Sequence, residues 1–134
     1  MKVFVSYDRS DSKIAHRLAK SLEAAGAKVF SVKELKLWEN WSASLERELR
    51  GSDEMVVLLT DKSAKSPNVM FEMGLAAGMR LPIVVIEMGV KPELKSSLGI
   101  FQHVRYSNLD GYIRRLSDRV RSPKPGKLSS NPLR

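Results

Sequence analysis

Two short segments of this 134-residue chain consist only of apolar residues, Met55–Leu59 and Ile83–Ile86. Such runs are typical of strands in a parallel sheet, because helices cover both faces of the sheet and no side of the strand meets water. The stretch between them, Ser66–Gly78, predicts a helix, since Ser66 suits the N-cap and Pro67 suits the first helical position. We therefore expect a strand–helix–strand unit in the middle of the chain.

The rest of the chain continues this alternation. Further strands are expected at Lys2–Tyr7, Ala27–Phe30 and, more weakly, Gln102–Tyr106. Apolar residues at helical spacing predict helices over Ile14–Ala25, Trp41–Leu49 and Leu109–Val120, and glycines follow the first two. The segment Glu87–Gly99, which contains a proline, is expected to be a long loop.

This alternation defines the predicted fold class. Alternating strands and helices form a parallel sheet with helices on both faces, and five strands suggest the order 2-1-3-4-5. The expected architecture is α/β, a flavodoxin-like three-layer sandwich in one domain of residues 1–121. Residues 122–134 are rich in Pro, Ser and Gly, which predicts a flexible C-terminal tail or linker.

Composition argues against several classes of function. The chain has no cysteine, and its two histidines, His16 and His103, are far apart, so neither disulfides nor a zinc site is expected. No apolar run approaches a membrane span, and Met1-Lys2 leads into a strand rather than a signal peptide, so we expect a cytoplasmic protein with no membrane partner. A net charge of +8 could attract a polyphosphate compound or an acidic partner. No nucleic-acid motif accompanies it, so no nucleic-acid partner is expected.

Glu72 is the most distinctive residue of the predicted central helix. From Val69 to Met79 every other residue is apolar or small, and burying an unpaired charge is costly. At helical spacing Asn68, Glu72 and Ala76 share one face, which predicts a polar groove. The alternative is that Glu72 faces solvent or interacts with the positive helix N-terminus, although that dipole effect fades after the first turn.

The predicted topology also indicates where a ligand binds. In open α/β sheets ligands bind beyond the carboxyl ends of the strands, at the switch point between strands 1 and 3. The loops expected there begin at Tyr7-Asp8-Arg9, at Ser31–Trp38, at Thr60–Pro67 and at Glu87. Glu72 belongs to the helix that leaves one of these loops.

Several segments, taken in order, resemble a Toll/interleukin-1 receptor (TIR) domain. The resemblance begins with Val3–Tyr7, Asp11 and a helix that ends at Gly26 before Val29-Phe30. It continues with Trp41, Ser52-Asp53 and Leu58–Thr60. Ser66–Val69 with Glu72 and Gly74 is similar to the bacterial branch of the family, and the whole match extends over residues 2–120.

The resemblance implies an activity and roles for particular residues. Enzymatic members of the family cleave the nicotinamide–ribose bond of NAD and need the glutamate of this motif, which is Glu72 here. The tyrosine of the first loop corresponds to Tyr7, and the second-loop region that gates the pocket corresponds to Ser31–Asn40. One departure concerns Trp38, which stands where the family often has glycine, because tryptophan does not accept a positive φ cheaply.

The chemistry of that bond fits the residues present. Cleavage builds positive charge at C1 of the ribose, and nicotinamide leaves as a neutral molecule, so one carboxylate is enough to stabilise or attack that carbon. Flat rings such as Tyr7 and Trp38 could stack on nicotinamide or adenine, and Arg9 and Lys33 could neutralise the pyrophosphate. Besides catalytic Glu72, the predicted substrate-binding residues are Tyr7, Asp8, Arg9, Lys33, Trp38, Ser66 and Asn68. No metal is expected, and NAD+ is the substrate rather than a cofactor.

Three functions remain open at this point. The first is an NAD+ glycohydrolase or cyclase, self-associating through TIR–TIR contacts and acting in bacterial antiphage defence. The second is a non-catalytic TIR–TIR interaction module. The third is a nucleoside 2-deoxyribosyltransferase-like enzyme, which Asn68–Gly74 followed by a strand also resembles; the opening Val3–Tyr7 favours the TIR interpretation.

Overall fold

The structure, a computed structural model, describes residues 1–31 and 41–122 of the chain. Its centre is one sheet of five parallel strands in the order β2-β1-β3-β4-β5. The strands are β1 (Lys2–Ser6), β2 (Lys28–Phe30), β3 (Glu54–Leu59), β4 (Ile83–Glu87) and β5 (Gln102–Arg105). The predicted α/β class and strand order are confirmed, with strand ends that differ from the expected ones by a residue.

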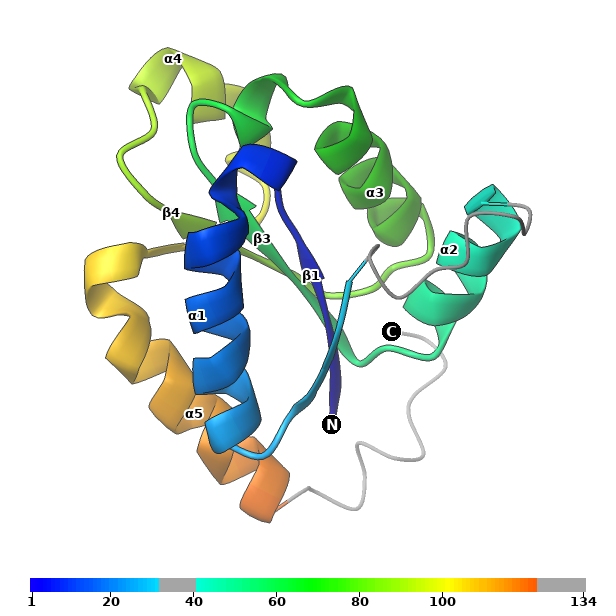
Figure 1. The fold of residues 1–134 in the computed structure, drawn as a ribbon, viewed down its shortest axis with the longest axis vertical. Coiled ribbons are helices and arrows are strands. Elements are labelled where there is room, and N and C mark those ends of the chain that lie inside the picture. The colour runs from blue at the N-terminus through cyan, green and yellow to red at the C-terminus, as the bar shows by residue number, and fades with distance from the viewer. Residues whose placement is uncertain (32–40, 123–134) are drawn as a thin grey trace.

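Helices cover both faces of this sheet (Figure 1). They are α1 (Ser12–Ala24), α2 (Trp41–Arg50), α3 (Pro67–Gly78), the single turn α4 (Pro92–Lys95) and α5 (Leu109–Arg121). Short 3-10 turns precede or follow them at Arg9–Asp11, Ser63–Lys65, Ser96–Leu98 and Tyr106–Asn108. No helix in the described part of the chain is both long and apolar enough to cross a membrane.

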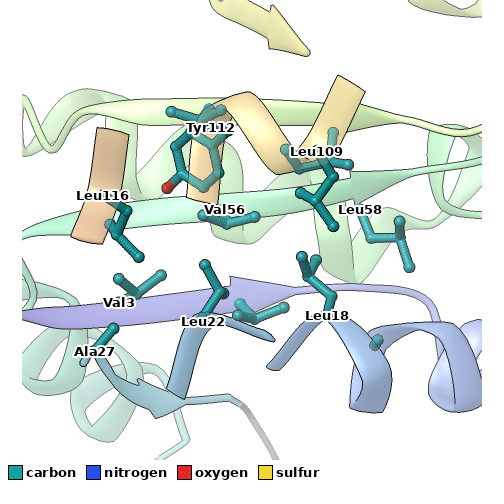
Figure 2. Close-up of a cluster of buried hydrophobic side chains, with 13 residues drawn as sticks. Val3, Leu18, Leu22, Ala27, Val56, Leu58, Leu109, Tyr112 and Leu116 are labelled. Atoms are coloured by element: carbon teal, nitrogen blue, oxygen red, sulfur yellow. The ribbon is translucent and has the colours of Figure 1, made fainter. Parts of the chain in front are cut away.

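Alternation along the strands divides the core into two clusters. Val3 and Val5 of β1 face α1 and α5, whereas Phe4 faces α2 and α3. Figure 2 shows the first cluster, in which Leu18 and Leu22 of α1 and Leu116 of α5 point toward the strands. The central strand β3 is buried along its whole length, as the apolar run Met55–Leu59 predicts for all but its first residue, Glu54. Side chains from both layers of helices therefore hold the sheet in place.

One expectation about the helices was wrong. The segment Glu87–Gly99 is not simply a loop, because it contains α4 and a 3-10 turn. The helix that contains Glu72 matches the expected stretch, since α3 ends at Gly78. Arg80 then takes a left-handed backbone conformation, with φ of 61°, which stops the helix before the proline.

Candidate active site

A cavity of about 450 Å³ lies at the carboxyl ends of β1 and β3, next to the start of α3. β2 ends at Phe30, which pairs with Phe4, so the last residues of β1 extend beyond their neighbour. The cavity is lined by Val5, Tyr7, Asp8, Arg9, Ser66, Asn68 and Glu72. The position is the switch point predicted from the strand order, and six of the predicted site residues lie together there.

The first wall of the cavity is the turn that follows β1. Asp8 caps the 3-10 turn at Arg9–Asp11: its carboxylate accepts the backbone N–H of Ser10 at 3.0 Å, and its carbonyl accepts the N–H of Asp11 at 2.8 Å. Hydrogen bonds from the hydroxyl and amide of Ser10 lower the pKa of the Asp8 carboxyl from its ordinary value. The Asp8 carboxylate is therefore an anion whose hydrogen bonds hold the turn in place. The next residue, Arg9, is exposed.

The second wall is the first turn of α3. Ser66 is the N-cap, as predicted, and its hydroxyl accepts the N–H of Val69 at 3.3 Å. Pro67 occupies the first turn without losing a hydrogen bond. This start places Asn68 at the mouth and Glu72 one turn deeper, so that both line the cavity. Ser66 also lines it, but its oxygen is committed to the cap.

Glu72 is buried, with only 3% of its surface exposed, so the alternative that it faces solvent is wrong. Its Oε1 accepts a hydrogen bond of 2.5 Å from the Ser6 hydroxyl. Burial raises the pKa of Glu72 to about 7, and the hydrogen bond from Ser6 opposes that shift. The carboxyl group is thus poised to change its charge near neutral pH.

A polar network joins the loops that follow β1 and β3. Buried Asp11 accepts a hydrogen bond of 2.6 Å from the Thr60 hydroxyl. The Ser63 hydroxyl accepts the N–H of Thr60 at 2.8 Å and donates to the carbonyl of Leu58, also at 2.8 Å. The Ser63 N–H in turn donates to the Thr60 hydroxyl at 3.2 Å. This brace fixes the distance between the two loops that hold the site.

Sequence reasoning missed Ser6 and Val5, which also belong to this region. Side chains alternate along a strand, so Ser6 points to the same side of the sheet as Phe4, toward α3, but no signal in the sequence singled it out. Two predicted binding residues, Lys33 and Trp38, lie outside the described residues, as does most of the Ser31–Asn40 region. Within the described ranges, no group of three or more His, Asp or Glu side chains is placed to hold a metal ion.

Comparison with known families decides what kind of domain this is. A family model of the TIR domain matches residues 3–119, most of the chain. The chain is a TIR domain. No match was found among curated proteins.

Solved structures with the same fold include other TIR domains. The TIR domain of the Toll-related receptor TRR-2 from Hydra magnipapillata is 14% identical, with a TM-score of 0.67, over 89% of this chain and 97% of that one. The TIR domains of the activated Roq1 resistosome, which recognises the pathogen effector XopQ, are 22% identical, with a TM-score of 0.59, over 92% and 84% of the two chains. At these identities the likeness shows the fold of this TIR domain.

A glycosidase also has a similar fold. The CMP N-glycosidase BcmB of Clostridium botulinum is 17% identical, with a TM-score of 0.60, and the match covers 87% of this TIR domain and 98% of the glycosidase. The same arrangement of strands and helices therefore occurs in a protein that acts on an N-glycosidic bond.

Proposed function

We propose that this TIR domain is an NAD+ glycohydrolase or cyclase that cleaves the nicotinamide–ribose bond. The observation that carries the proposal is the environment of Glu72. A buried carboxyl group with a pKa of about 7 lines a cavity at the switch point of the sheet. Membership of a family with NAD-cleaving members supports the assignment, as does the fold shared with an N-glycosidase.

The chemistry assigns a role to the ionised form of Glu72. When the bond between C1 and the nicotinamide nitrogen breaks, its electron pair goes to the nitrogen, and nicotinamide leaves without needing a proton. The carboxylate stabilises the cationic ribose carbon or bonds to it. Water then adds at C1 and releases a proton, which gives ADP-ribose; attack by an adenine nitrogen of the same molecule gives a cyclic isomer.

The other cavity residues would bind the rest of the substrate. Tyr7 offers a flat ring for nicotinamide, and exposed Arg9 offers a guanidinium for the pyrophosphate. Asn68, one helical turn before Glu72, is placed to hydrogen-bond a ribose hydroxyl. Lys33 and Trp38 remain predicted binding residues from the sequence alone.

The test is nicotinamide release from NAD+ by the full chain, followed chromatographically. Wild type should produce nicotinamide together with ADP-ribose or a cyclic isomer, and Glu72→Gln should not. Glu93→Gln, an exposed glutamate of α4, is the matched control and should behave as wild type. Equal rates for wild type and Glu72→Gln would show that Glu72 is not the reacting group.

A nucleotide or nucleoside N-glycosidic bond is the second candidate substrate. The fold likeness to the CMP N-glycosidase favours it, and the sequence resemblance to nucleoside 2-deoxyribosyltransferases points the same way. A neutral base leaves more easily when protonated, and a carboxyl group with a pKa of about 7 is partly protonated at neutral pH. Parallel assays with NAD+, CMP and deoxynucleosides separate these candidates, and no turnover of any of them favours a non-catalytic interaction module.

Self-association forms part of the proposal. The TIR domains of the similar resistosome structure belong to an assembly, and the cavity here is open to solvent on the side of Arg9 and Asn68. Specific activity is therefore expected to rise with protein concentration, and Trp38→Ala is expected to lower it without unfolding the domain. Constant specific activity over a hundredfold dilution series, or full activity of Trp38→Ala, would contradict this.

A role in antiphage defence is supported by the resemblance of Ser66–Gly74 to bacterial TIR domains. Cells that express wild type should lose NAD+ during phage infection and resist it. Cells that express Glu72→Gln should do neither. Protection by Glu72→Gln equal to that by wild type would separate defence from catalysis.

A further inference from the structure

Ser6 lies behind Glu72 rather than in the cavity. It is the last residue of β1, only 1% of its surface is exposed, and it does not line the cavity. Alternation along β1 turns Ser6 toward α3, on the same side of the sheet as Phe4. The hydroxyl therefore contacts the carboxyl group from the sheet side and cannot contact a substrate in the cavity.

The two oxygens of Glu72 have different surroundings. Oε1 accepts the hydrogen bond from Ser6, at a length typical of a hydroxyl that donates to a carboxylate. Within the described part of the chain, every buried side-chain oxygen has a hydrogen-bond partner. Oε2 has no such partner among the described residues, and Glu72 lines the cavity, so Oε2 is the oxygen that is open to it.

A glutamate needs such a contact in order to hold its carboxyl group in one orientation. The last torsion of its side chain has a broad, roughly two-fold profile, so packing around the methylene groups does not fix the carboxyl plane. We propose that Ser6 is the positioning residue of Glu72, holding Oε1 against the sheet so that Oε2 faces the cavity as the reacting oxygen. This inference rests on the proposed function for the reacting role of Oε2, but the contact can be tested without turnover.

The same contact affects the charge of Glu72. Burial raises the pKa of Glu72, and the Ser6 hydrogen bond is the opposing influence. The titratable or charged groups that share the cavity are Tyr7, Asp8 and Arg9, and none of them is among the causes of the shift. Without the hydroxyl, Glu72 should therefore hold its proton to a higher pH.

The first experiment follows the side-chain carboxyl carbon of Glu72 by NMR during a pH titration of the full chain. In Ser6→Ala the pKa of Glu72 should rise by about one unit or more, because a hydrogen bond to a charged group has been removed. Ser44→Ala is the matched control, since Ser44 is an equally buried serine, on α2, whose hydroxyl accepts from Arg47 at 3.3 Å. It should leave the pKa of Glu72 unchanged.

A second pair of variants covers the case in which Ser6→Ala does not fold. Ser6→Thr and Ser6→Val have nearly the same shape, and both suit a strand, but only threonine keeps the hydroxyl. Glu72 should titrate near its wild-type pKa in Ser6→Thr and at a higher pH in Ser6→Val. The same pKa in both variants would overturn the inference.

The activity measurement then tests positioning. The rise of kcat/KM with pH should move to higher pH in Ser6→Val and return toward wild type in Ser6→Thr. At a pH where Glu72 is fully ionised in all variants, Ser6→Val should keep a deficit of about tenfold, which reports the lost orientation. Equal kcat/KM there would overturn the positioning role. If wild type cleaves no N-glycosidic bond, the proposed function fails, and the NMR titrations alone decide whether Ser6 holds Glu72.

Discussion

Two glutamates are buried in the part of the chain that the structure describes, one at each end of the sheet, and their surroundings differ. Glu54 begins β3 at the amino end, accepts the hydroxyl of Tyr112, and forms an ion pair of 3.0 Å with Arg119. Glu72 lies at the carboxyl end and accepts one hydroxyl, that of Ser6. Both residues are 3% exposed, so burial alone does not distinguish them.

The partners of Glu54 make that end of the sheet a structural joint. Burial and the nearby charge of Glu54 raise the pKa of Tyr112, so its hydroxyl remains a hydrogen-bond donor. Arg119 supplies the positive charge that a buried carboxylate needs. Together they attach α5 to the central strand of the sheet.

The two glutamates differ in how many of their carboxyl oxygens are held by the protein. Glu54 has both oxygens occupied, whereas Glu72 has a single hydroxyl partner and an oxygen open to a cavity. Burial of Glu72 therefore lowers the stability of the domain at the carboxyl end of the sheet, whereas the contacts of Glu54 stabilise the amino end. Perturbed carboxyl groups in clefts are candidates for function for this reason.

The largest expected effect is on catalysis by Glu72→Gln. Loss of the charge should lower nicotinamide release on the order of a thousandfold, as removal of a group that stabilises transition-state charge does. Circular dichroism should show an intact fold. Glu54→Gln, measured in parallel, should retain activity per folded molecule, and a comparable loss in that variant would show that the two ends are coupled.

The pH dependence of stability gives the second comparison. The pKa of Glu72 is raised on folding, so the proton-bound form is favoured in the folded state. Its contribution to stability is present below the unfolded pKa and is lost as pH rises through about 7. Between pH 5 and pH 8, wild type should lose about 2 to 3 kcal/mol of unfolding free energy relative to Glu72→Gln. Urea unfolding measures this difference, and parallel pH profiles of the two proteins would contradict it.

Glu54→Gln should destabilise the domain at neutral pH, where Glu72→Gln removes an unfavourable buried charge. It should lower the unfolding free energy by about 2 kcal/mol at neutral pH, because Arg119 loses its partner and one hydrogen bond at this joint is weakened. The expected loss is small for a buried ion pair because Arg119 is 41% exposed and water screens its charge. Urea unfolding at pH 7 checks it, with Glu46→Gln, a glutamate paired to exposed Arg50, as the matched surface variant.

The smallest effect is expected from removing residues 122–134. The sequence predicts a tail with too few apolar residues to pack, so the unfolding free energy should change by less than about 0.5 kcal/mol. The pKa of Glu72 should stay the same. A large loss of stability would show that this segment packs on the domain, so that the stability of the two ends of the sheet would depend on residues beyond 121.

Much of the fold could be predicted because its determinants are local in the sequence. The uninterrupted apolar runs of β3 and β4 indicated a parallel sheet, and Ser66-Pro67 indicated the start of α3. The four residues of α4 escaped prediction because so short a helix has no periodic pattern. Glu54 was not recognised as buried, since its partners Tyr112 and Arg119 lie 58 and 65 residues away.

The site was predicted in part for the same reason. A single carboxylate among apolar helical residues stands out in the sequence itself, so Glu72 could be selected from the sequence. Ser6 could not, because a serine at the end of a strand has no pattern of its own and its partner is 66 residues away. Asp11, Thr60 and Ser63 likewise form a network only after the loops following β1 and β3 have been brought together.

That brace has a consequence for motion. The N–H of Thr60 and the N–H of Ser63 each donate to the other residue's hydroxyl oxygen, and Asp11 adds a link from the first loop. These amides should be among the slowest in the loops to exchange with deuterium, because opening one bond disturbs the others. The loops that follow β1 and β3 should then move as one body with the sheet. Faster motion is then expected among the cavity-lining residues outside this network, such as exposed Arg9 and Asn68.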